Sequence, residues 1–366
     1  MRTIVISGVN LRQGGTLSIL KDCLQYLSAN VVSEDTRVVA IVHKKELCLF
    51  DGIEYIEMPS TIKGWSRRLW CEYVTMRQIS KRLSPVYLWF SLHDTSPLVL
   101  AERQAVYCQT SFPFYKASLK DLYFSYKIVL FSLFTRFAYR INVHANDYLV
   151  VQQPWLRKGL SKMLNVSEER FIVAPPRKSE VRITPEPIDK KNYTFIYPAA
   201  PDCHKNFQVL CEAAAKLEKE VGQDRFTVVV TVNGEENRYT RWLKQKWGNV
   251  SSIQFTGLMS KEKLYGYYEA ADCLVFPSKV ETWGLPISEF SEYGKPMLIA
   301  DRPYSHGTAE GSLATAFFDP DDSDSLKNLM KSVLIGDMSQ LKKIPQSEIA
   351  PPYAESWASL FDMLLA

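Results

Sequence analysis

Residues 276–296, FPSKVETWGLPISEFSEYGKP, hold the pattern that decides the fold. A short apolar run ends at Phe276 and predicts a buried strand. The loop that follows contains Glu281 and Gly284, and Pro286 then stands where the first residue of a helix is expected. Strand, loop and helix in this order are half of a βαβ unit, so the stretch predicts a parallel sheet covered by helices.

The chemistry of this stretch follows from its predicted geometry. A helix N-terminus carries unpaired N–H groups and a partial positive charge, which suit a diphosphate. Gly284 leaves room for the backbone to approach a phosphate closely. Glu281, just ahead of the helix, can accept hydrogen bonds from sugar hydroxyls, and Glu289 can accept them from a ribose diol. The pattern therefore favours a site for a nucleotide that carries a sugar.

The same alternation of strand and helix recurs along the whole chain. Apolar or β-branched runs predict strands at residues 3–7, 37–42, 86–90, 105–108, 148–151, 171–174, 193–197, 226–232, 253–255, 273–276 and 297–300. Helices are expected at residues 17–27, 67–82, 205–221, 237–247, 261–270, 286–293 and 353–365. Alternation of this kind predicts an α/β protein with doubly wound parallel sheets.

A proline-rich stretch divides this alternation into two halves. Residues 175–190, PPRKSEVRITPEPIDK, show no apolar periodicity and are expected to be a linker. Residues 1–174 and residues 191–350 are then expected to be two Rossmann-like domains. Residues 351–366 are expected to form a C-terminal helix that packs back on the first domain. Two such domains face each other across a cleft, which is the default ligand site.

The stretch 276–296 closely resembles the E-x7-E signature of the family-4 type of retaining GT-B glycosyltransferases, the group 1 glycosyl transferases. The surrounding pattern P-S-x-x-E-x-[FW]-G-L-P-x-x-E followed by G-x-P is also present. The matching residues are Pro277, Ser278, Glu281, Trp283, Gly284, Leu285, Pro286, Glu289, Gly294 and Pro296. The alternative is a chance match of an ordinary strand, loop and helix.

The resemblance covers nearly the whole chain and implies roles for further residues. Lys205, within His204-Lys205-Asn206, matches the basic residue that faces the leaving diphosphate, where a fixed ammonium stabilises the charge that develops. Glu281 and Lys205 are thus implied catalytic residues, and His93 and Gln109 are two further catalytic candidates. The resemblance also implies that residues 1–174 bind the acceptor and residues 191–350 the nucleotide sugar. The implied donor-binding residues are Gly14, Gly15, Asn233, Gly234, Leu258, Trp283, Gly284, Leu285 and Glu289. Plain turns are the alternative at the glycine pairs.

The sequence departs from the family's pattern at two places. Ala200 stands where an arginine is often found, so the donor phosphates depend more on Lys205. Gln109 stands where related enzymes often carry an acceptor-side histidine, and glutamine can bind a sugar hydroxyl but cannot take its proton. His93, at the end of a predicted strand, is the remaining candidate for an acceptor-side acid or base. A structural histidine is the alternative there.

Composition narrows the class of protein. The chain has 366 residues, 46% of them hydrophobic and 23% charged, which suits two globular domains. Seven cysteines are dispersed without a C-x-x-C pair, and the N-terminus lacks the pattern of a signal peptide, so we expect a cytoplasmic protein. Residues 1–180 contain 24 Lys and Arg against 15 Asp and Glu, whereas the remainder contains 20 against 25. This modest basic excess is a poor fit to nucleic-acid binding.

Residues 112–140 form an aromatic and basic segment. It contains ten aromatic residues and five Lys or Arg, with Asp121 as its single acid. Such composition in a helix suits the surface of an anionic bilayer, and Trp65, Arg67, Arg68 and Trp70 add a second patch of similar character. A core helix with a solvated basic rim is the alternative.

Taken with these observations, the resemblance implies a retaining hexosyltransferase that needs no metal ion. Its donor is a nucleotide-diphosphate sugar, and its acceptor is a saccharide or lipid-linked saccharide, as in bacterial surface-polysaccharide, O-antigen, capsule or glycolipid synthesis. Two alternatives keep the fold: a non-catalytic nucleotide-sugar-binding subunit and a sugar-nucleotide epimerase. The donor nucleotide, the sugar, the linkage and the oligomeric state stay open, because pocket shape and a few hydrogen bonds decide such specificity.

Overall fold

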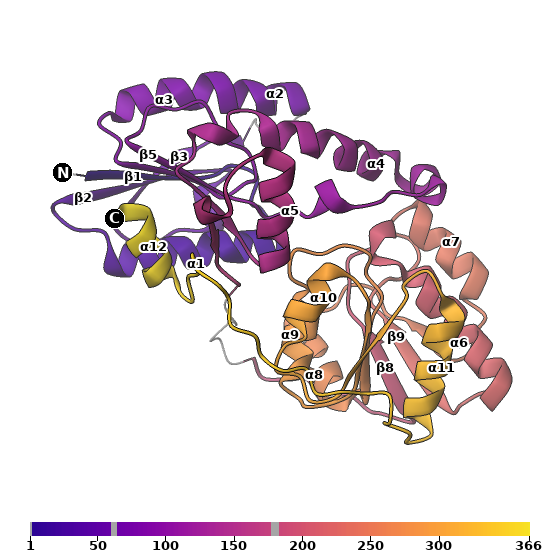
Figure 1. The fold of residues 1–366 in the computed structure, drawn as a ribbon. Coiled ribbons are helices and arrows are strands. Elements are labelled where there is room, and N and C mark those ends of the chain that lie inside the picture. Colours follow the sequence, from indigo (N-terminus) through magenta and orange to yellow (C-terminus); the bar gives the residue numbers. More distant parts are fainter. Residues whose placement is uncertain (1, 60–63, 177–182) are drawn as a thin grey trace. The chain divides into compact units, whose positions relative to one another are not determined.

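The computed structural model describes residues 2–59, 64–176 and 183–366. The chain divides into two compact units. Unit 1 comprises Met1–Pro113, Leu133–Arg177 and Ile349–Ala366, and unit 2 comprises Phe114–Ser132 and Lys178–Glu348. Figure 1 shows the fold of each unit as a sheet between helices.

Unit 1 contains a seven-stranded parallel sheet in the order β3-β2-β1-β4-β5-β6-β7. The strands are β1 (Arg2–Gly8), β2 (Thr36–Val42), β3 (Ile53–Glu57), β4 (Leu88–Ser91), β5 (Arg103–Tyr107), β6 (Tyr148–Val151) and β7 (Phe171–Val173). The helices are α1 (Gly14–Asn30), α2 (Trp65–Trp70), α3 (Met76–Leu83), the second half of α4 (Leu119–Arg140), α5 (Pro154–Leu164) and α12 (Trp357–Leu365). The strand order reverses direction between β1 and β4, which is the switch point where parallel α/β sheets bind ligands.

Apolar side chains cover both faces of this sheet, as expected for parallel strands. One core contains Ile4, Leu24 and Phe90 and includes α1 and α12. The other contains Val5, Trp89 and residues of the α2–α3 region. Accordingly, α1 and α12 lie side by side on one face in Figure 1, and α2 and α3 lie on the other.

The C-terminal helix α12 completes unit 1. Phe361 is 1% exposed, stacks on Tyr26 with 5.6 Å between ring centroids, and meets Phe90 edge-on at 6.1 Å. The hydroxyl of Tyr87 donates a hydrogen bond to the carbonyl of Leu365 (2.8 Å). The chain therefore leaves unit 1 after β7 and returns to it at its C-terminal end.

Unit 2 contains a six-stranded parallel sheet in the order β10-β9-β8-β11-β12-β13. Its strands are β8 (Tyr193–Tyr197), β9 (Phe226–Val230), β10 (Ile253–Phe255), β11 (Cys273–Phe276), β12 (Met297–Ala300) and β13 (Thr315–Phe318). Its helices are α6 (Phe207–Val221), α7 (Arg238–Trp247), α8 (Lys261–Ala270), α9 (Leu285–Ser291), α10 (Pro303–Thr308) and α11 (Ser323–Leu334). The switch point of this sheet lies between β8 and β11.

Residues 114–132 differ from the expected division of the chain, because they pack with unit 2 although they precede the linker. Phe124 packs on Tyr239 and Trp242 of α7, with centroid distances of 5.3 and 4.9 Å. The guanidinium of Arg238 lies 3.6 Å from the ring centroid of Tyr123 and donates to that residue's carbonyl. The aromatic residues that make this segment unusual in sequence thus supply its packing.

Several predicted elements differ in extent from the observed ones. The helix expected at 67–82 is three pieces, α2, a π-helical turn at Cys71–Thr75, and α3. The helix expected at 286–293 is the shorter α9, and the C-terminal helix begins at Trp357 rather than at 353. Strands β3 and β13 were not expected. The expected linker falls partly on residues 177–182, which lie outside the described residues.

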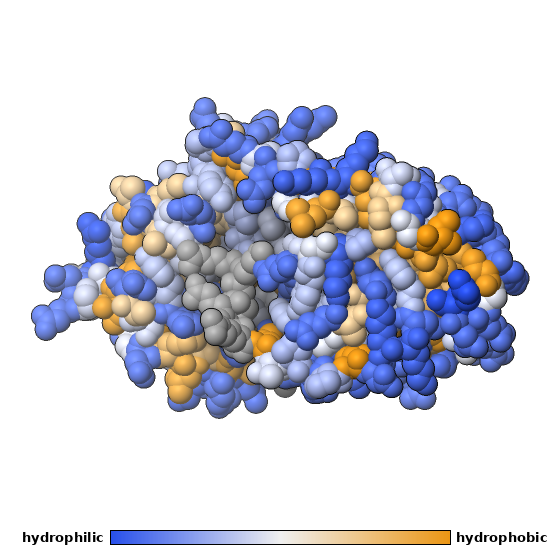
Figure 2. Space-filling model, turned by 90° about the horizontal axis from the view of Figure 1, so that it is seen from below, coloured by the Kyte–Doolittle hydropathy of each residue, from blue (hydrophilic) through white to orange (hydrophobic). Residues whose placement is uncertain are grey.

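Within the described parts of the chain, no helix has both the length and the apolar character needed to cross a bilayer. Figure 2 shows one face of the molecule, on which hydrophilic residues predominate and apolar residues gather in separate patches.

Replacing Phe361 tests the packing of α12. We expect Phe361→Ala to lower the free energy of unfolding by about 3 kcal/mol, because it leaves a cavity between α12, Tyr26 and Phe90. Urea denaturation followed by circular dichroism measures the change. The exposed neighbour Asp362→Ala is the matched control and should change stability by less than about 0.5 kcal/mol. Equal effects of the two substitutions would contradict the described packing.

Candidate donor site and acceptor edge

Lys205 and Glu281 meet at the switch point of unit 2. Lys205 ends the short turn after β8, and Glu281 lies in the loop after β11. The Lys205 Nζ atom donates to Glu281 Oε1 at 2.6 Å, although 76 positions separate the two residues. Their side chains are 17% and 15% exposed, so each keeps some access to solvent. The two predicted catalytic residues therefore form one ion pair.

Backbone contacts to buried tyrosines hold these two loops in place. The hydroxyl of Tyr197 donates to the carbonyl of Lys205 (2.6 Å), and that of Tyr304 donates to the carbonyl of Ser278 (2.7 Å). Both tyrosines lie in the aromatic core of unit 2, where Phe276 contacts each of them. The loops at the switch point are thus positioned by the core itself.

The two loops also bind each other directly. The amide of Lys279 donates to the carbonyl of His204 (2.9 Å). Asn206 has a left-handed backbone (φ 61°), and its side-chain amide donates to the carbonyl of Pro277 (3.1 Å). An asparagine tolerates this conformation better than most residues, which explains His204-Lys205-Asn206 at this turn.

Burial raises the pKa of two further acidic groups in unit 2. Burial raises the pKa of Asp202, although the neighbouring Lys205 acts in the opposite direction. Burial likewise raises the pKa of Glu289, whose Oε2 atom accepts a hydrogen bond from the Tyr268 hydroxyl (3.0 Å). Glu289 lies on α9, the helix that directly follows the loop of Glu281. Both carboxylates of the E-x7-E pattern therefore follow β11, on the carboxyl side of the sheet.

A left-handed glycine and a hydrogen-bonded indole lie just before α9. Gly284 has a φ of 95°, and a Cβ atom there would lie 3.3 Å from Ile287 Cδ1. The indole N–H of Trp283 donates to Ser288 Oγ (3.1 Å), which ties the loop to the helix. Leu285, the first residue of α9, is 38% exposed.

The loops after β9 and β10 adjoin one another in the same unit. Gly234 has a φ of 95°, and a Cβ atom there would lie 2.6 Å from Lys244 Cβ, so only glycine fits. The amides of Asn233 and Gly234 both donate to the carboxylate of Glu236. A Cβ atom added at Gly257 would lie 3.3 Å from Asn233 Cβ, and the next residue, Leu258, is 96% exposed.

In unit 1, Gly14 and Gly15 begin α1 after the loop that follows β1. Both glycines are exposed, and a Cβ atom added at Gly14 would meet no atom within 4 Å. The preceding residue, Gln13, provides no side-chain cap. The start of α1 is therefore open for backbone contact with a ligand.

His93 is enclosed at the switch point of unit 1. Its ring is 1% exposed, and Nε2 lies 2.8 Å from Ser7 Oγ at the end of β1. Nδ1 lies 3.1 Å from Thr95 Oγ1 and 3.3 Å from Glu72 Oε1. Burial, with the charge of Arg68 second, lowers the pKa of His93 to about 3. These contacts favour the structural alternative, because a neutral, enclosed imidazole offers no proton to an acceptor near neutral pH.

Glu72 is a functional candidate that sequence reasoning missed. It lies on the π-helical turn Cys71–Thr75 and is fully buried, with Oε1 3.4 Å from Arg68 Nε. Burial raises its pKa to about 7, with Arg68 acting in the opposite direction. Arg68 also donates to the carbonyl of His93 (2.9 Å), so it belongs to this cluster rather than to a free surface patch. The sequence pattern did not single out Glu72 as a buried residue, because it does not predict the π-helical turn that directs this side chain inward.

Gln109 lies at the end of β5, beside the loop of His93 and Asp94. Its amide N–H donates to Asp94 Oδ1 (2.5 Å), and its side-chain amide donates to the carbonyl of Leu92 (2.7 Å). Asp94 also accepts hydrogen bonds from the Thr110 amide (2.9 Å) and the Tyr139 hydroxyl (2.6 Å). The Gln109 side chain is 9% exposed, and its carbonyl oxygen has no hydrogen-bond partner among the described residues.

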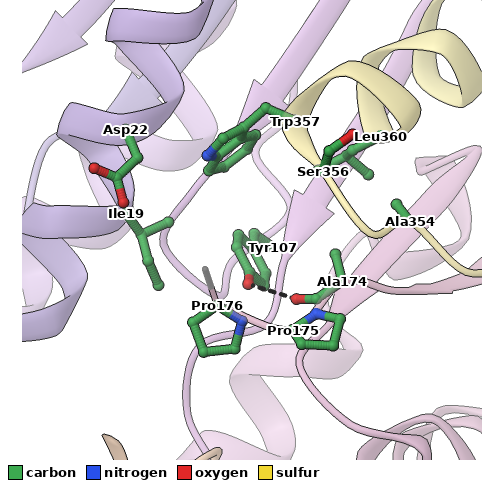
Figure 3. Close-up of a pocket in the computed structure, with 10 residues that line it drawn as sticks. All are labelled: Ile19, Asp22, Tyr107, Ala174, Pro175, Pro176, Ala354, Ser356, Trp357 and Leu360. Atoms are coloured by element: carbon green, nitrogen blue, oxygen red, sulfur yellow. Dashed lines mark hydrogen bonds between the residues drawn. The ribbon is translucent and has the colours of Figure 1, made fainter. Parts of the chain in front are cut away.

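A pocket in unit 1 is lined by none of the predicted site residues. Figure 3 shows it between α1, the end of β5, the segment after β7 and α12. The Tyr107 hydroxyl donates to the carbonyl of Ala174 there (3.1 Å). Its apolar lining includes Ile19, Trp357 and Leu360. We assign this pocket to the junction of α12 with the rest of unit 1.

Comparisons with known proteins find glycosyltransferases. Residues 179–347 match the family model described as "Glycosyl transferases group 1". The O-antigen chain mannosyltransferase RfbU of Salmonella typhimurium is 22% identical over 245 residues, which are 66% of this chain and 63% of RfbU. This chain thus covers less than two thirds of that relative's length.

Two solved structures share the fold. WaaG, a glycosyltransferase involved in lipopolysaccharide biosynthesis, is 17% identical with a TM-score of 0.63, covering 92% of each chain. HepE from Anabaena in complex with UDP-glucose is 12% identical with a TM-score of 0.61, covering 94% of this chain and 92% of that one. The two parallel α/β units are therefore those of a GT-B fold, which confirms the predicted fold class.

Replacing Glu72 tests the buried cluster through pH. The pKa of Glu72 is raised in the folded protein, so its stabilising protonated form is present below the unfolded pKa of about 4.3 and is lost as pH rises through about 7. Between pH 5 and pH 8, we expect the free energy of unfolding of Glu72→Gln to rise by about 2–3 kcal/mol relative to that of the wild type. Urea denaturation measures both values. The exposed Glu46→Gln is the control. Parallel profiles for wild type and Glu72→Gln would contradict the assignment.

Proposed function

We propose that this chain is a glycosyltransferase that moves a hexose from a nucleotide-diphosphate sugar to a saccharide or lipid-linked saccharide. The transfer retains the anomeric configuration and uses no metal ion. The observation that carries the proposal is the Lys205–Glu281 pair at the switch point of unit 2, where α/β sheets bind ligands. The match of residues 179–347 to group 1 glycosyl transferases supports it.

The proposed roles follow from the chemistry of each group. The Lys205 ammonium neutralises the diphosphate as the bond between the sugar C1 and the phosphate oxygen breaks. Glu281 accepts hydrogen bonds from hydroxyls of the transferred sugar, and Glu289 accepts them from the ribose. Exposed Leu258 offers an apolar surface to the nucleoside, beside Asn233 and Gly234.

Retention follows in this proposal from attack on the same face of the sugar that the phosphate leaves. The acceptor oxygen forms the new bond to C1, and its proton passes to an oxygen of the departing diphosphate. This proton transfer needs no base from the protein. The proposal therefore fits Gln109, which cannot take a proton, and His93, which is enclosed and neutral. Gln109 then orients the acceptor through its carbonyl oxygen.

The biological setting is proposed from relatives. RfbU is named for O-antigen mannosyl transfer, WaaG for lipopolysaccharide biosynthesis, and HepE was solved with UDP-glucose. We propose a comparable role in bacterial surface-polysaccharide, O-antigen, capsule or glycolipid assembly. A cytoplasmic location is consistent with the seven cysteines, each of which is a buried free thiol.

Substitution of the ion pair tests the catalytic roles. We expect Lys205→Met and Glu281→Gln each to lower kcat at least about a hundredfold, because each removes charge that contacts the reacting groups. Release of nucleotide diphosphate in the presence of cell-envelope glycolipid extract measures turnover. Lys219→Met, an exposed lysine on α6, is the matched control, and added EDTA should leave the rate unchanged. A rate that EDTA abolishes would contradict the metal-free mechanism.

Product analysis separates the alternatives within the fold. A transferase yields a glycosylated acceptor together with nucleotide diphosphate. An epimerase yields a new sugar or free nucleotide without any acceptor, and a non-catalytic subunit binds donor without turnover. Either of the latter results, from folded wild-type protein supplied with acceptor, would overturn the proposal.

A thermal-shift screen identifies the donor nucleotide. Ligands that bind only the native state raise the apparent Tm, so one of UDP, GDP, dTDP or their sugar conjugates should stabilise the wild type. Glu289→Ala should abolish that shift in Tm. Glu292→Ala, three residues farther along the chain, is the control and should keep the shift. A shift unchanged in Glu289→Ala would contradict the ribose assignment.

A further inference from the structure

Residues 114–132, which belong to unit 2 although they precede the linker, contact the turn that carries Lys205. The rings of Tyr115 and His204 meet edge to face, with 6.2 Å between centroids and 72° between ring planes. Both residues are buried, at 5% and 7% exposed. His204 directly precedes Lys205 in the three-residue turn Cys203–Lys205, so the Tyr115 ring packs one residue away from the ion pair with Glu281.

Asp121 is a second buried group of this segment beside the same turn. It is 6% exposed, and its Oδ2 atom accepts hydrogen bonds from the amide (2.6 Å) and the hydroxyl (2.8 Å) of Ser118. Burial, followed by the negative charge of Asp121, raises the pKa of Cys203 to about 12. The same two causes, in the same order, raise the pKa of Tyr115. Asp121 therefore lies close to both the start of the segment and the first residue of the turn.

The rest of the segment is anchored separately from this turn. Ser132 Oγ donates to the carbonyl of Tyr115 (3.1 Å), which ties the two ends of the segment together. Phe124, in the middle, packs on Trp242 of α7 with 4.9 Å between ring centroids. Residues 114–132 therefore meet the turn from a support that α7 provides.

The core of unit 2 holds the same turn through its carbonyl groups. The Tyr197 hydroxyl donates to the carbonyl of Lys205 (2.6 Å), and the Lys279 amide donates to that of His204 (2.9 Å). The side chain of His204, by contrast, lies against Tyr115. The turn is thus held from two sides, and residues 114–132 act on the positions directly before Lys205.

We propose that Tyr115 and Asp121 are positioning residues for Lys205. They hold the turn Cys203–Lys205 so that the ammonium group of Lys205 is directed at the diphosphate of the donor. This inference rests on the proposed function, because it takes Lys205 as the group that binds the diphosphate. A fixed ammonium stabilises the developing charge better than a mobile one, because it need not reorient as the bond breaks.

The inference adds residues from outside the part of the chain that matches the family, which is residues 179–347. Loss of the Tyr115 ring leaves a cavity beside His204, into which the turn can shift. A shift of about 1 Å at a group that contacts the reacting atoms can lower a rate by about a hundredfold. The positioning role therefore predicts an effect on diphosphate binding and on kcat, beyond any loss of stability.

Calorimetric titration measures the positioning role directly. UDP, GDP and dTDP are titrated into the wild type, and the one that binds is used for every variant. Tyr115→Leu should weaken its binding about fivefold to tenfold, because Lys205 is no longer held in place. Tyr115→Phe keeps the ring against His204 and should bind within about twofold of the wild type. Wild-type affinity in Tyr115→Leu would overturn the proposal.

Phe124→Leu is the matched control, because Phe124 is an aromatic residue of the same segment that packs on Trp242 of α7. It should leave the affinity for the diphosphate within about twofold of the wild type. Equal weakening by Tyr115→Leu and Phe124→Leu would show a general loosening of the segment and would contradict a specific role. Circular dichroism checks that each variant is folded, and Tyr115→Met, which fills more of the cavity, replaces Tyr115→Leu if that variant does not fold.

Asp121 has its own matched pair of substitutions. Asp121→Ala removes the acceptor of both Ser118 hydrogen bonds and should weaken diphosphate binding about threefold or more. Asp121→Asn keeps an oxygen atom at that place and should bind at least as well as the wild type, because losing a negative charge reduces the repulsion of phosphate. Equal weakening by the two variants would overturn the role of Asp121.

A double-mutant cycle shows whether Tyr115 acts through Lys205. In Lys205→Gln protein, Tyr115→Leu should change the diphosphate affinity by less than about twofold, because the group that it positions is gone. Additive losses would overturn the proposal. The cycle also separates this inference from the proposed function. No binding to the wild type, or no effect of Lys205→Gln, would contradict the donor site and this inference with it, whereas weakening by Lys205→Gln without weakening by Tyr115→Leu would contradict the positioning role alone.

Discussion

The ion pair between Lys205 and Glu281 joins two loops that meet only because β8 and β11 are neighbours at the switch point of unit 2. Bringing two charges out of water is costly unless they pair, so their proximity constrains both loops at once. Tyr197 and Tyr304 fix the backbones of those loops from the core below. In the proposed reaction, the diphosphate of the donor binds Lys205 and the sugar binds Glu281, in place of the contact between the two residues.

Unit 1 uses the same topology for a different kind of cluster. At its switch point, Ser7 lies at the end of β1 and His93 follows β4. Glu72 and Arg68 complete this largely buried polar group. Such a network holds the loop geometry, since each buried polar atom needs its partner. Asp94, after β4, joins Gln109, after β5, to Tyr139 of α4, because its Oδ1 atom accepts hydrogen bonds from the Gln109 amide and the Tyr139 hydroxyl. These contacts fix the two loops relative to α4.

The sequence was informative where local chemistry decides structure. Apolar runs located most strands, whereas the positive φ of Gly284 was not part of the expectation for residues 276–296. Pairing of Lys205 with Glu281 is a tertiary contact, expected through the resemblance rather than from spacing. The π-turn that buries Glu72, the break at Ser125 and the packing of Phe124 on α7 depend on distant contacts. The spacing of apolar residues in α4 could not show whether its apolar face is buried or exposed, because both arrangements have the same spacing.

The central claim is that Lys205 binds the diphosphate of the donor and Glu281 binds its sugar. Calorimetric titration of UDP, GDP and dTDP into wild type, Lys205→Gln and Glu281→Gln tests this claim most directly. We expect one diphosphate to bind the wild type and to bind Lys205→Gln at least about tenfold more weakly. Glu281→Gln should bind it as well as the wild type or better, because removing a carboxylate reduces the repulsion of phosphate. Equal weakening by both substitutions would show a purely structural pair. No binding of any diphosphate to folded wild type would contradict the donor site itself.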